Sequence, residues 1–154
     1  MSWVSSFPGG SDGDAVIMTK DELKNIPYLD GLINSKVRQL DQLKRYRGRL
    51  PTYKGQEAIQ SGSVGDPTAS IALKIVRLDE EIARDIERLV DLKAEAQVLF
   101  ARLDDDLKYR SVMELRYLEC MSWREVAQSL HFSHKHVFKL HGEALRRLYD
   151  VDTK

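Results

Sequence analysis

A heptad repeat between Ile71 and Leu103 constrains the fold of this chain more than any other feature of its sequence. Apolar residues recur every seven positions in two interleaved sets, with one aspartate among them: Ile75, Ile82, Leu89, Ala96 and Leu103, and Ile71, Leu78, Asp85, Leu92 and Leu99. This spacing places both sets along one seam of a helix with the period of a coiled coil. Such a helix extends ~50 Å at ~1.5 Å per residue. Because an apolar seam needs a partner to cover it, we expect a second helix beside it.

A second amphipathic stretch, residues 29–50, is the expected partner. Its apolar residues are spaced by three and four positions: Leu29, Leu32, Ile33, Val37, Leu40, Leu43 and Tyr46. Pro27 stands near its predicted start, and Gly48 followed by Pro51 marks its end. Residues 51–67 carry three glycines and two prolines and predict a loop. The two stretches therefore predict an antiparallel helical (coiled-coil) hairpin.

Three regions follow from this pattern. Residues 1–20 are rich in Ser, Gly and Asp and show no apolar period, which predicts a flexible tail. Met18 opens the segment MTKDEL and looks like a natural start. Residues 21–106 form the predicted hairpin, and residues 107–150 form a separate module of shorter helices. The expected fold class is all-α.

Charge is segregated along the chain although the formal net charge is zero. Residues 29–50 hold six basic and two acidic side chains, whereas residues 71–106 hold six basic and ten acidic ones. Residues 131–148 hold four basic side chains and one acidic one. We expect the basic residues 44–49 to meet the acidic residues 79–81 when the hairpin folds back, and we expect the basic C-terminal segment to face an anionic partner.

Composition excludes several classes of protein. The single cysteine, Cys120, excludes an intramolecular disulfide and a zinc site built from cysteines. No apolar run approaches ~20 residues, so no membrane span is expected. The N-terminal residues lack the basic start and apolar core of a signal peptide. The sequence predicts a cytoplasmic protein.

The segment from Ser122 to Leu140 carries the functional signal. Ser122 lies three residues before Glu125, the spacing of a capping box that starts a helix. His131 and Phe132 form the predicted turn, and Ser133 is expected to cap a following basic helix. A short helix, a three- to four-residue turn and a basic helix is the helix-turn-helix layout.

Residues 110–148, RSVMELRYLECMSWREVAQSLHFSHKHVFKLHGEALRRL, resemble region 4 of sigma-70-type transcription factors. The matching elements are LRYLE, then SWREVA with a leucine three residues on, then the S-x-x-x-V-x-x-L and A-L-x-x-L spacings. The predicted hairpin followed by this module resembles small phage-encoded transcription regulators of the ArpU/RinA type. The resemblance implies a DNA-binding activator of phage late genes in a bacterial cytoplasm. Two positions depart from the pattern. His131 stands where the turn usually has glycine, and Gly142 lies inside the recognition helix. Either departure indicates a close backbone approach or a slightly bent helix.

The expected DNA contacts lie on the basic helix and at the start of the helix before it. The candidate residues are Arg124, Ser133, His134, Lys135, His136, Lys139, Arg146 and Arg147. Trp123 and Phe132 are expected to pack, and Phe138 is placed at the edge of the core, where contact with a thymine methyl is the alternative. The histidines do not predict a metal site, because only His134 and His141 share a helix face.

No Ser/His/Asp set, paired-carboxylate motif or glycine-rich phosphate loop appears, so we expect neither an enzyme nor a cofactor. The sequence favours a sequence-specific regulator that binds double-stranded DNA. Two alternatives stay open: a module that binds bacterial RNA polymerase, and a DNA-packaging component like a small terminase subunit.

The length of the heptad seam predicts a homodimer. Residues 71–103 outrun residues 29–50, so part of the seam is expected to pack on the DNA-binding module or on a second chain: Leu89, Leu92, Ala96, Leu99 and Phe100. We favour the second chain, because the two DNA-binding modules of a dimer would bind two half-sites on the DNA. Asp85 is expected to mark either the end of intrachain packing or a place where an arginine from the first helix reaches in.

Overall fold

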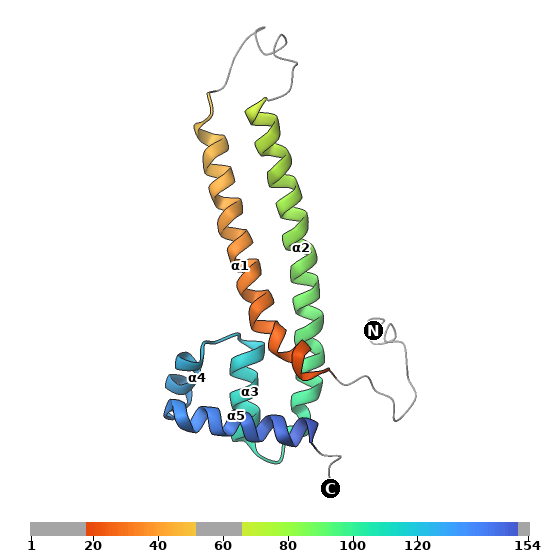
Figure 1. The fold of residues 1–154 in the computed structure, drawn as a ribbon, viewed down its shortest axis with the longest axis vertical. Coiled ribbons are helices and arrows are strands. Elements are labelled where there is room, and N and C mark those ends of the chain that lie inside the picture. The colour runs from red at the N-terminus through yellow and green to blue at the C-terminus, as the bar shows by residue number, and fades with distance from the viewer. Residues whose placement is uncertain (1–17, 52–65, 151–154) are drawn as a thin grey trace, which may run out of the picture. The chain divides into compact units, whose positions relative to one another are not determined.

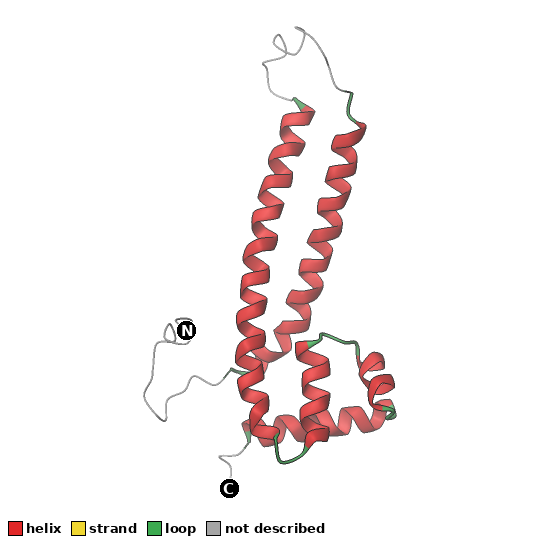
Figure 2. Cartoon of the chain, turned by 180° about the vertical axis from the view of Figure 1, so that it is seen from behind, coloured by secondary structure: helices red, strands yellow, loops and turns green. Residues whose placement is uncertain are grey.

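The computed structural model describes residues 18–51 and 66–150, and these are helical throughout apart from short connections, with no strand among them (Figures 1 and 2). The elements are α1 (Lys20–Arg49), α2 (Pro67–Phe100), the 3-10 turn η3 (Ala101–Leu103), α3 (Leu107–Met113), the π-helical turn η4 (Glu114–Leu118), α4 (Trp123–Leu130) and α5 (His134–Tyr149). The all-α prediction is confirmed for these ranges. The tail predicted before residue 18 and most of the loop predicted at 51–67 lie outside the described residues.

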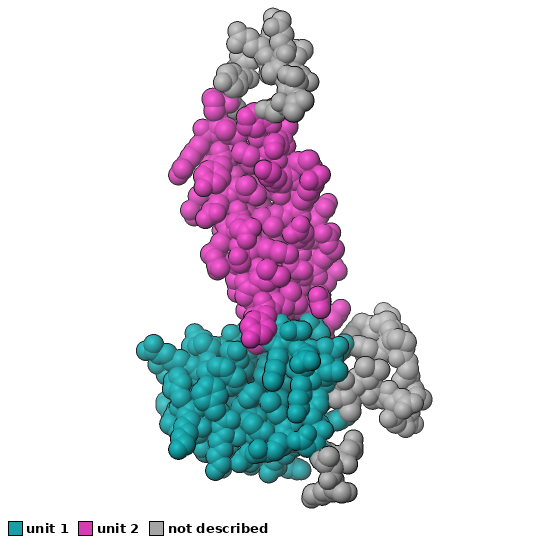
Figure 3. All heavy atoms as spheres, viewed as in Figure 1, with its two compact units in different colours: residues 1–26, 92–154 teal, residues 27–91 magenta. Residues whose placement is uncertain are grey.

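The described chain forms two compact units (Figure 3). Unit 2 comprises residues 27–91, and the described part of unit 1 comprises residues 18–26 and 92–150. Both long helices contribute to each unit, and the boundary within α1 falls between Ile26 and Pro27.

Helix α1 begins at Lys20, earlier than the start that Pro27 predicted. The Thr19 hydroxyl accepts a hydrogen bond from the Glu22 backbone N–H at 3.2 Å, and a Glu22 carboxylate oxygen accepts one from the Thr19 N–H at 2.8 Å. This reciprocal capping box starts the helix. Met18 is buried, and its carbonyl oxygen accepts a hydrogen bond from the Tyr149 hydroxyl at 2.8 Å. The assignment of residues 18–20 to a flexible tail is therefore wrong, because the capping signal lies ahead of the proline.

Unit 2 is built from α1 and α2 lying side by side (Figure 1). Its buried centre consists of Leu40, Ile75 and Ile82, against which Leu43, Ile71 and Leu78 pack. These residues belong to the predicted heptad seam and to the predicted apolar face of residues 29–50. The seam is confirmed in this unit.

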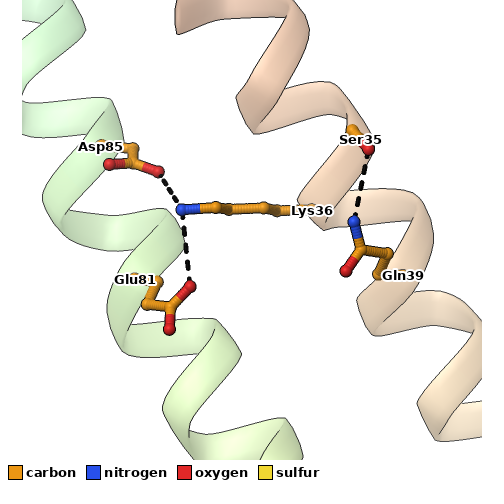
Figure 4. Close-up of polar contacts among 5 residues, drawn as sticks. All are labelled: Ser35, Lys36, Gln39, Glu81 and Asp85. Atoms are coloured by element: carbon orange, nitrogen blue, oxygen red, sulfur yellow. Dashed lines mark hydrogen bonds and ion pairs between the residues drawn. The ribbon is translucent and has the colours of Figure 1, made fainter.

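Asp85 interrupts the seam and is met by a lysine of α1 (Figure 4). Lys36 Nζ lies 2.6 Å from Asp85 Oδ2 and 3.4 Å from Glu81 Oε2. The side chains of Lys36 and Asp85 are only 19% and 22% exposed. The hydrogen bond to Asp85 is the main cause that raises the pKa of Lys36 above its ordinary value. A cation from the first helix does reach in, but it is a lysine and not the expected arginine.

The expected pairing of residues 44–49 with residues 79–81 is wrong. Among the described residues, the ion pairs that join the two helices of unit 2 are those of Lys36. Leu40 packs with Ile75 and Ile82, so the helix register brings the middle of the 29–50 stretch, rather than its basic end, opposite the acidic residues.

The far end of the seam is covered within unit 1. Ala96, Leu99 and Phe100 are buried, and the Phe100 ring lies 6.1 Å from that of Tyr117 between centroids. Of the two expected covers for these residues, packing within the chain is the one observed. Helix α1 has 30 residues against 34 in α2 and begins earlier than expected, so the two helices differ less in length than the sequence predicted. The homodimer stays a prediction.

The short helices of unit 1 are started by local caps. The Asp106 carboxylate accepts a hydrogen bond from the Lys108 backbone N–H at 3.1 Å and caps α3. Arg110 pairs with Asp104 and, at 2.7 Å, with Glu114 one turn later.

Within the ranges that the structure covers, no helix combines the length and the apolar character needed to cross a lipid bilayer.

Candidate nucleic-acid interface

Helix α4 begins with the capping box that the sequence predicted. The Glu125 N–H donates to the Ser122 hydroxyl at 3.2 Å, and the Ser122 N–H donates to the Glu125 carboxylate at 2.7 Å. The hydrogen bond from the Ser122 backbone is the main cause that lowers the pKa of Glu125. Val126 and Ala127 on this helix are buried. The cap therefore fixes where α4 starts and which of its faces is turned inward.

The connection between α4 and α5 turns sharply at His131, which adopts the left-handed conformation with φ 58° and ψ 38°. The N–H of Phe132 bonds the carbonyl of Ala127 at 3.0 Å, which closes the end of α4 in the manner of a Schellman motif. The Ser133 hydroxyl then accepts a hydrogen bond from the His136 N–H at 3.1 Å and caps α5. His131 thus adopts the left-handed conformation that favours the glycine usual at this turn position, and the cap expected at Ser133 is confirmed.

Helix α5 has one buried face and one basic face. Its buried residues are Val137, Leu140, Ala144 and Leu148. Lys135, Lys139, Gly142 and Arg146 follow one another at spacings of four, three and four, and this places them on the side of the helix opposite the buried face. We call the three exposed cations Lys135, Lys139 and Arg146 the basic stripe.

The basic stripe has an acidic neighbour, Glu143, whose pKa is lowered by a hydrogen bond and also by the charges of Lys139 and Arg146. No salt bridge joins its three cations to an acidic side chain anywhere in the described chain. Glu143 is the acidic residue within α5, and its carboxylate instead accepts a hydrogen bond from the Tyr109 hydroxyl at 2.6 Å. That hydrogen bond lowers the pKa of Glu143 and raises the pKa of Tyr109. Glu143 therefore offsets part of the positive charge without forming a salt bridge, and the three cations of the basic stripe stay exposed.

The structure brings some of the predicted contact residues together and separates others. Seven of the eight are exposed: Arg124, Ser133, His134, Lys135, Lys139, Arg146 and Arg147. His136 is half-buried, with its ring edge-on to Phe132 at 4.7 Å between centroids. Arg124 lies on α4, whereas the basic stripe lies on α5. The Arg147 guanidinium lies 4.3 Å from the centre of the Tyr109 ring, so this arginine is partly engaged within the chain.

An aromatic cluster centred on Trp123 packs against α5. Trp123 lies 4.6 Å from His141 and 5.1 Å from Phe138 between ring centroids, and the Arg116 guanidinium lies 4.6 Å from its ring centre. Arg116 also donates to the Met121 carbonyl at 2.8 Å, which ties the turn before α4 to the same cluster. The predicted packing role of Trp123 is confirmed.

His141 belongs to this cluster and not to the basic face. Its Nε2 lies 2.7 Å from the Tyr117 hydroxyl. Burial lowers the pKa of His141 to about 4, and the charges of Lys24 and Arg116 act in the same direction. The described residues contain no group of three or more His, Cys, Asp or Glu side chains arranged to bind a metal ion.

Two features of the α5 surface can be compared with the sequence interpretation. Phe138 lies at the edge of the core, as expected, because its ring packs against Trp123 while 48% of the residue is exposed. Gly142 has no heavy atom within 4 Å of the position that a Cβ would occupy, so no close backbone approach exists there within the described chain. Helical spacing predicts this partial exposure of Phe138, because the residue follows buried Val137 by one position and therefore points ~100° away from it.

The family model described as "Protein of unknown function (DUF1492)" matches residues 55–149, which include all of α2 to α5. No curated protein sequence and no solved structure matches the chain.

Proposed function

We propose that this chain, which belongs to the DUF1492 family, binds double-stranded DNA with α4 and α5 acting as a helix-turn-helix. Helix α5 would enter the major groove with the basic stripe toward the nucleic acid. The observation that carries this proposal is the set of three exposed cations on one helix face, none of which forms a salt bridge among the described residues.

The arrangement suits phosphate binding for electrostatic reasons. Duplex DNA carries about one negative charge per 1.7 Å of its axis, and cations that neutralise phosphates release counterions. Lys135 and Arg146 are eleven residues apart, which corresponds to ~16 Å along a helix. A row of this length can contact phosphates on both sides of a groove that is ~12 Å wide.

The biological role follows from the resemblance to region 4 of sigma-70-type factors and to ArpU/RinA-type regulators. On that basis the protein is a transcription regulator, and activation of phage late genes in a bacterial cytoplasm is the specific form we propose. Binding to RNA polymerase without DNA is the competing function, because region 4 modules also contact polymerase.

The test begins with selection of a binding site from random duplexes, followed by fluorescence anisotropy across a salt series. We expect Lys135→Ala and Lys139→Ala each to weaken binding and to lower the slope of log affinity against log salt by about one. Lys74→Ala, a change of the same charge at an exposed site on α2, is the matched control and should bind like the wild type. A wild-type protein that binds no duplex at low salt would refute the proposal and favour the polymerase alternative.

A further inference from the structure

Phe138 is an apolar side chain exposed on a basic helix face. It lies three residues after Lys135 and one before Lys139, and 48% of it is exposed. Its ring packs against Trp123 at 5.1 Å between centroids, with the planes inclined by 54°. The tryptophan therefore holds one side of the phenyl ring, while the rest of the ring faces outward.

Gly142 keeps the outward side of this ring open. It lies one helical turn after Phe138, and side chains on a helix lean toward its N-terminus over the preceding turn. A Cβ at Gly142 would meet no heavy atom within 4 Å, those of the Phe138 ring included. Only a longer side chain at position 142 would reach over the phenyl ring, and glycine leaves that side uncovered. Glycine inside a helix is unfavourable relative to alanine, so the folding of α5 does not itself explain the residue.

By helical spacing, Phe138 and Gly142 lie next to the basic stripe. We call the exposed phenyl ring and the open position beside it the apolar notch. The surrounding positive charge draws a polyanion to this face, so the partner must offer an apolar group within an anionic surface. In the major groove of DNA, the base edges present hydrogen-bonding groups and one apolar group, the C5-methyl of thymine. We infer that the notch of Phe138 and Gly142 contacts a thymine methyl and makes Phe138 a specificity-determining residue.

This inference rests on the proposed function and adds base selectivity to it. The basic stripe would supply contacts that do not depend on sequence, whereas the notch would distinguish thymine from the other bases. The preference would be confined to one position in each binding site, because the notch is formed by one phenyl ring.

The experiment uses the duplex that the wild-type protein selects and the same duplex with each thymine replaced in turn by deoxyuridine, which lacks only the methyl group. At one position we expect the wild-type affinity to fall about fourfold, the value of one buried methyl group. Phe138→Ala should bind the thymine duplex more weakly by at least that factor and should not respond to deoxyuridine there. Its salt slope should equal that of the wild type, because no charge has been removed.

Gly142→Leu tests the second half of the notch, since it would cover the phenyl ring without removing it. We expect it to lose the response to deoxyuridine and to bind more weakly. Gly31→Leu is the matched control, because Gly31 also lies inside a long helix with no heavy atom within 4 Å of its Cβ position. Thermal unfolding checks that each variant is folded.

The possible outcomes distinguish failure of the notch proposal from failure of the DNA-binding proposal. Wild-type binding that is unchanged by deoxyuridine at every position, or a Phe138→Ala variant that still responds to it, would overturn the notch while leaving DNA binding intact. A wild-type protein that binds no duplex would overturn both. If Phe138→Ala leaves affinity unchanged and instead dissociates an oligomer in light scattering, the exposed ring contacts a second copy of the chain and the notch proposal is wrong.

Discussion

His141 should make the stability of unit 1 depend on pH between neutrality and pH 4. The perturbation is protonation of a half-buried imidazole whose Nε2 lies 2.7 Å from the Tyr117 hydroxyl and whose ring packs edge-on to Trp123. Charging it would place a cation among apolar neighbours and close to Lys24 and Arg116. The folded protein therefore resists protonation at this site.

The sign follows from the direction of the shift. Burial lowers the pKa of His141 from its ordinary value of 6.5 to about 4. Between these values the unfolded chain binds a proton that the folded chain does not, so falling pH favours unfolding. The stability that His141 contributes is complete above pH ~6.5, is lost progressively as the pH falls toward 4, and changes no further below that.

The magnitude can be worked from the same values. At ~1.36 kcal/mol per pH unit, the interval from 6.5 to about 4 corresponds to about 3.4 kcal/mol. Part of the imidazole remains in contact with solvent, which screens the neighbouring charges, and we reduce the figure by about half. We expect ~1.5–2 kcal/mol.

The assay compares urea unfolding of the wild type and of His141→Gln at pH 7.5 and pH 4.5. The variant cannot titrate at this position, and its amide can still bond the Tyr117 hydroxyl. The difference between the two pH dependences isolates His141 from the carboxylates, and His134→Gln, a change at an exposed histidine of α5, should follow the wild-type curve. Parallel curves for the wild type and His141→Gln, or an NMR titration that places the pKa of His141 near 6.5, would refute the reasoning.

Two further predictions concern local conformation and the ion pair of unit 2. His131→Gly should stabilise the protein by about 0.5–1 kcal/mol in urea unfolding, because glycine adopts the φ of 58° without steric penalty, and an unchanged or lower stability would contradict this. Lys36→Leu alone should lower the midpoint of thermal unfolding, since it leaves Asp85 in the seam without its 2.6 Å partner. Lys36→Leu combined with Asp85→Leu should restore the midpoint or raise it, as apolar pairs often do in place of buried ion pairs, and a double variant less stable than the single one would count against this.

Much of the local structure could be predicted from the sequence because its signals span only three or four residues. The Ser122–Glu125 capping box, the turn at His131 and the cap at Ser133 each depend on neighbouring groups that any chain with this order brings together. The heptad seam likewise follows from helix periodicity. The start of α1 also has a local signal, the capping pair of Thr19 and Glu22, which lies ahead of the start that Pro27 predicts.

The contacts that depend on how helices meet could not be obtained in this way. The sequence left two possibilities for Asp85, the end of intrachain packing or an arginine from the first helix. The register between α1 and α2 decides that Lys36 pairs with it, since a slip of one turn changes every facing pair. The same holds for the cover over Leu99 and Phe100, which is supplied by the packing of unit 1.

The candidate interface likewise combines features that the sequence alone determines with features that only helix packing determines. The sequence by itself determined that α5 is basic and where its cations stand, because helical spacing alone places Lys135, Lys139 and Arg146 on one face. Tertiary packing decided which charged side chains of α5 are engaged by α3, since Tyr109 bonds Glu143 and lies under Arg147. It also decided that Phe138, supported by Trp123, keeps half of its surface exposed. Periodicity fixes the direction in which a side chain leaves its helix, whereas burial and pairing depend on residues distant in the chain, and only the packed structure brings those together.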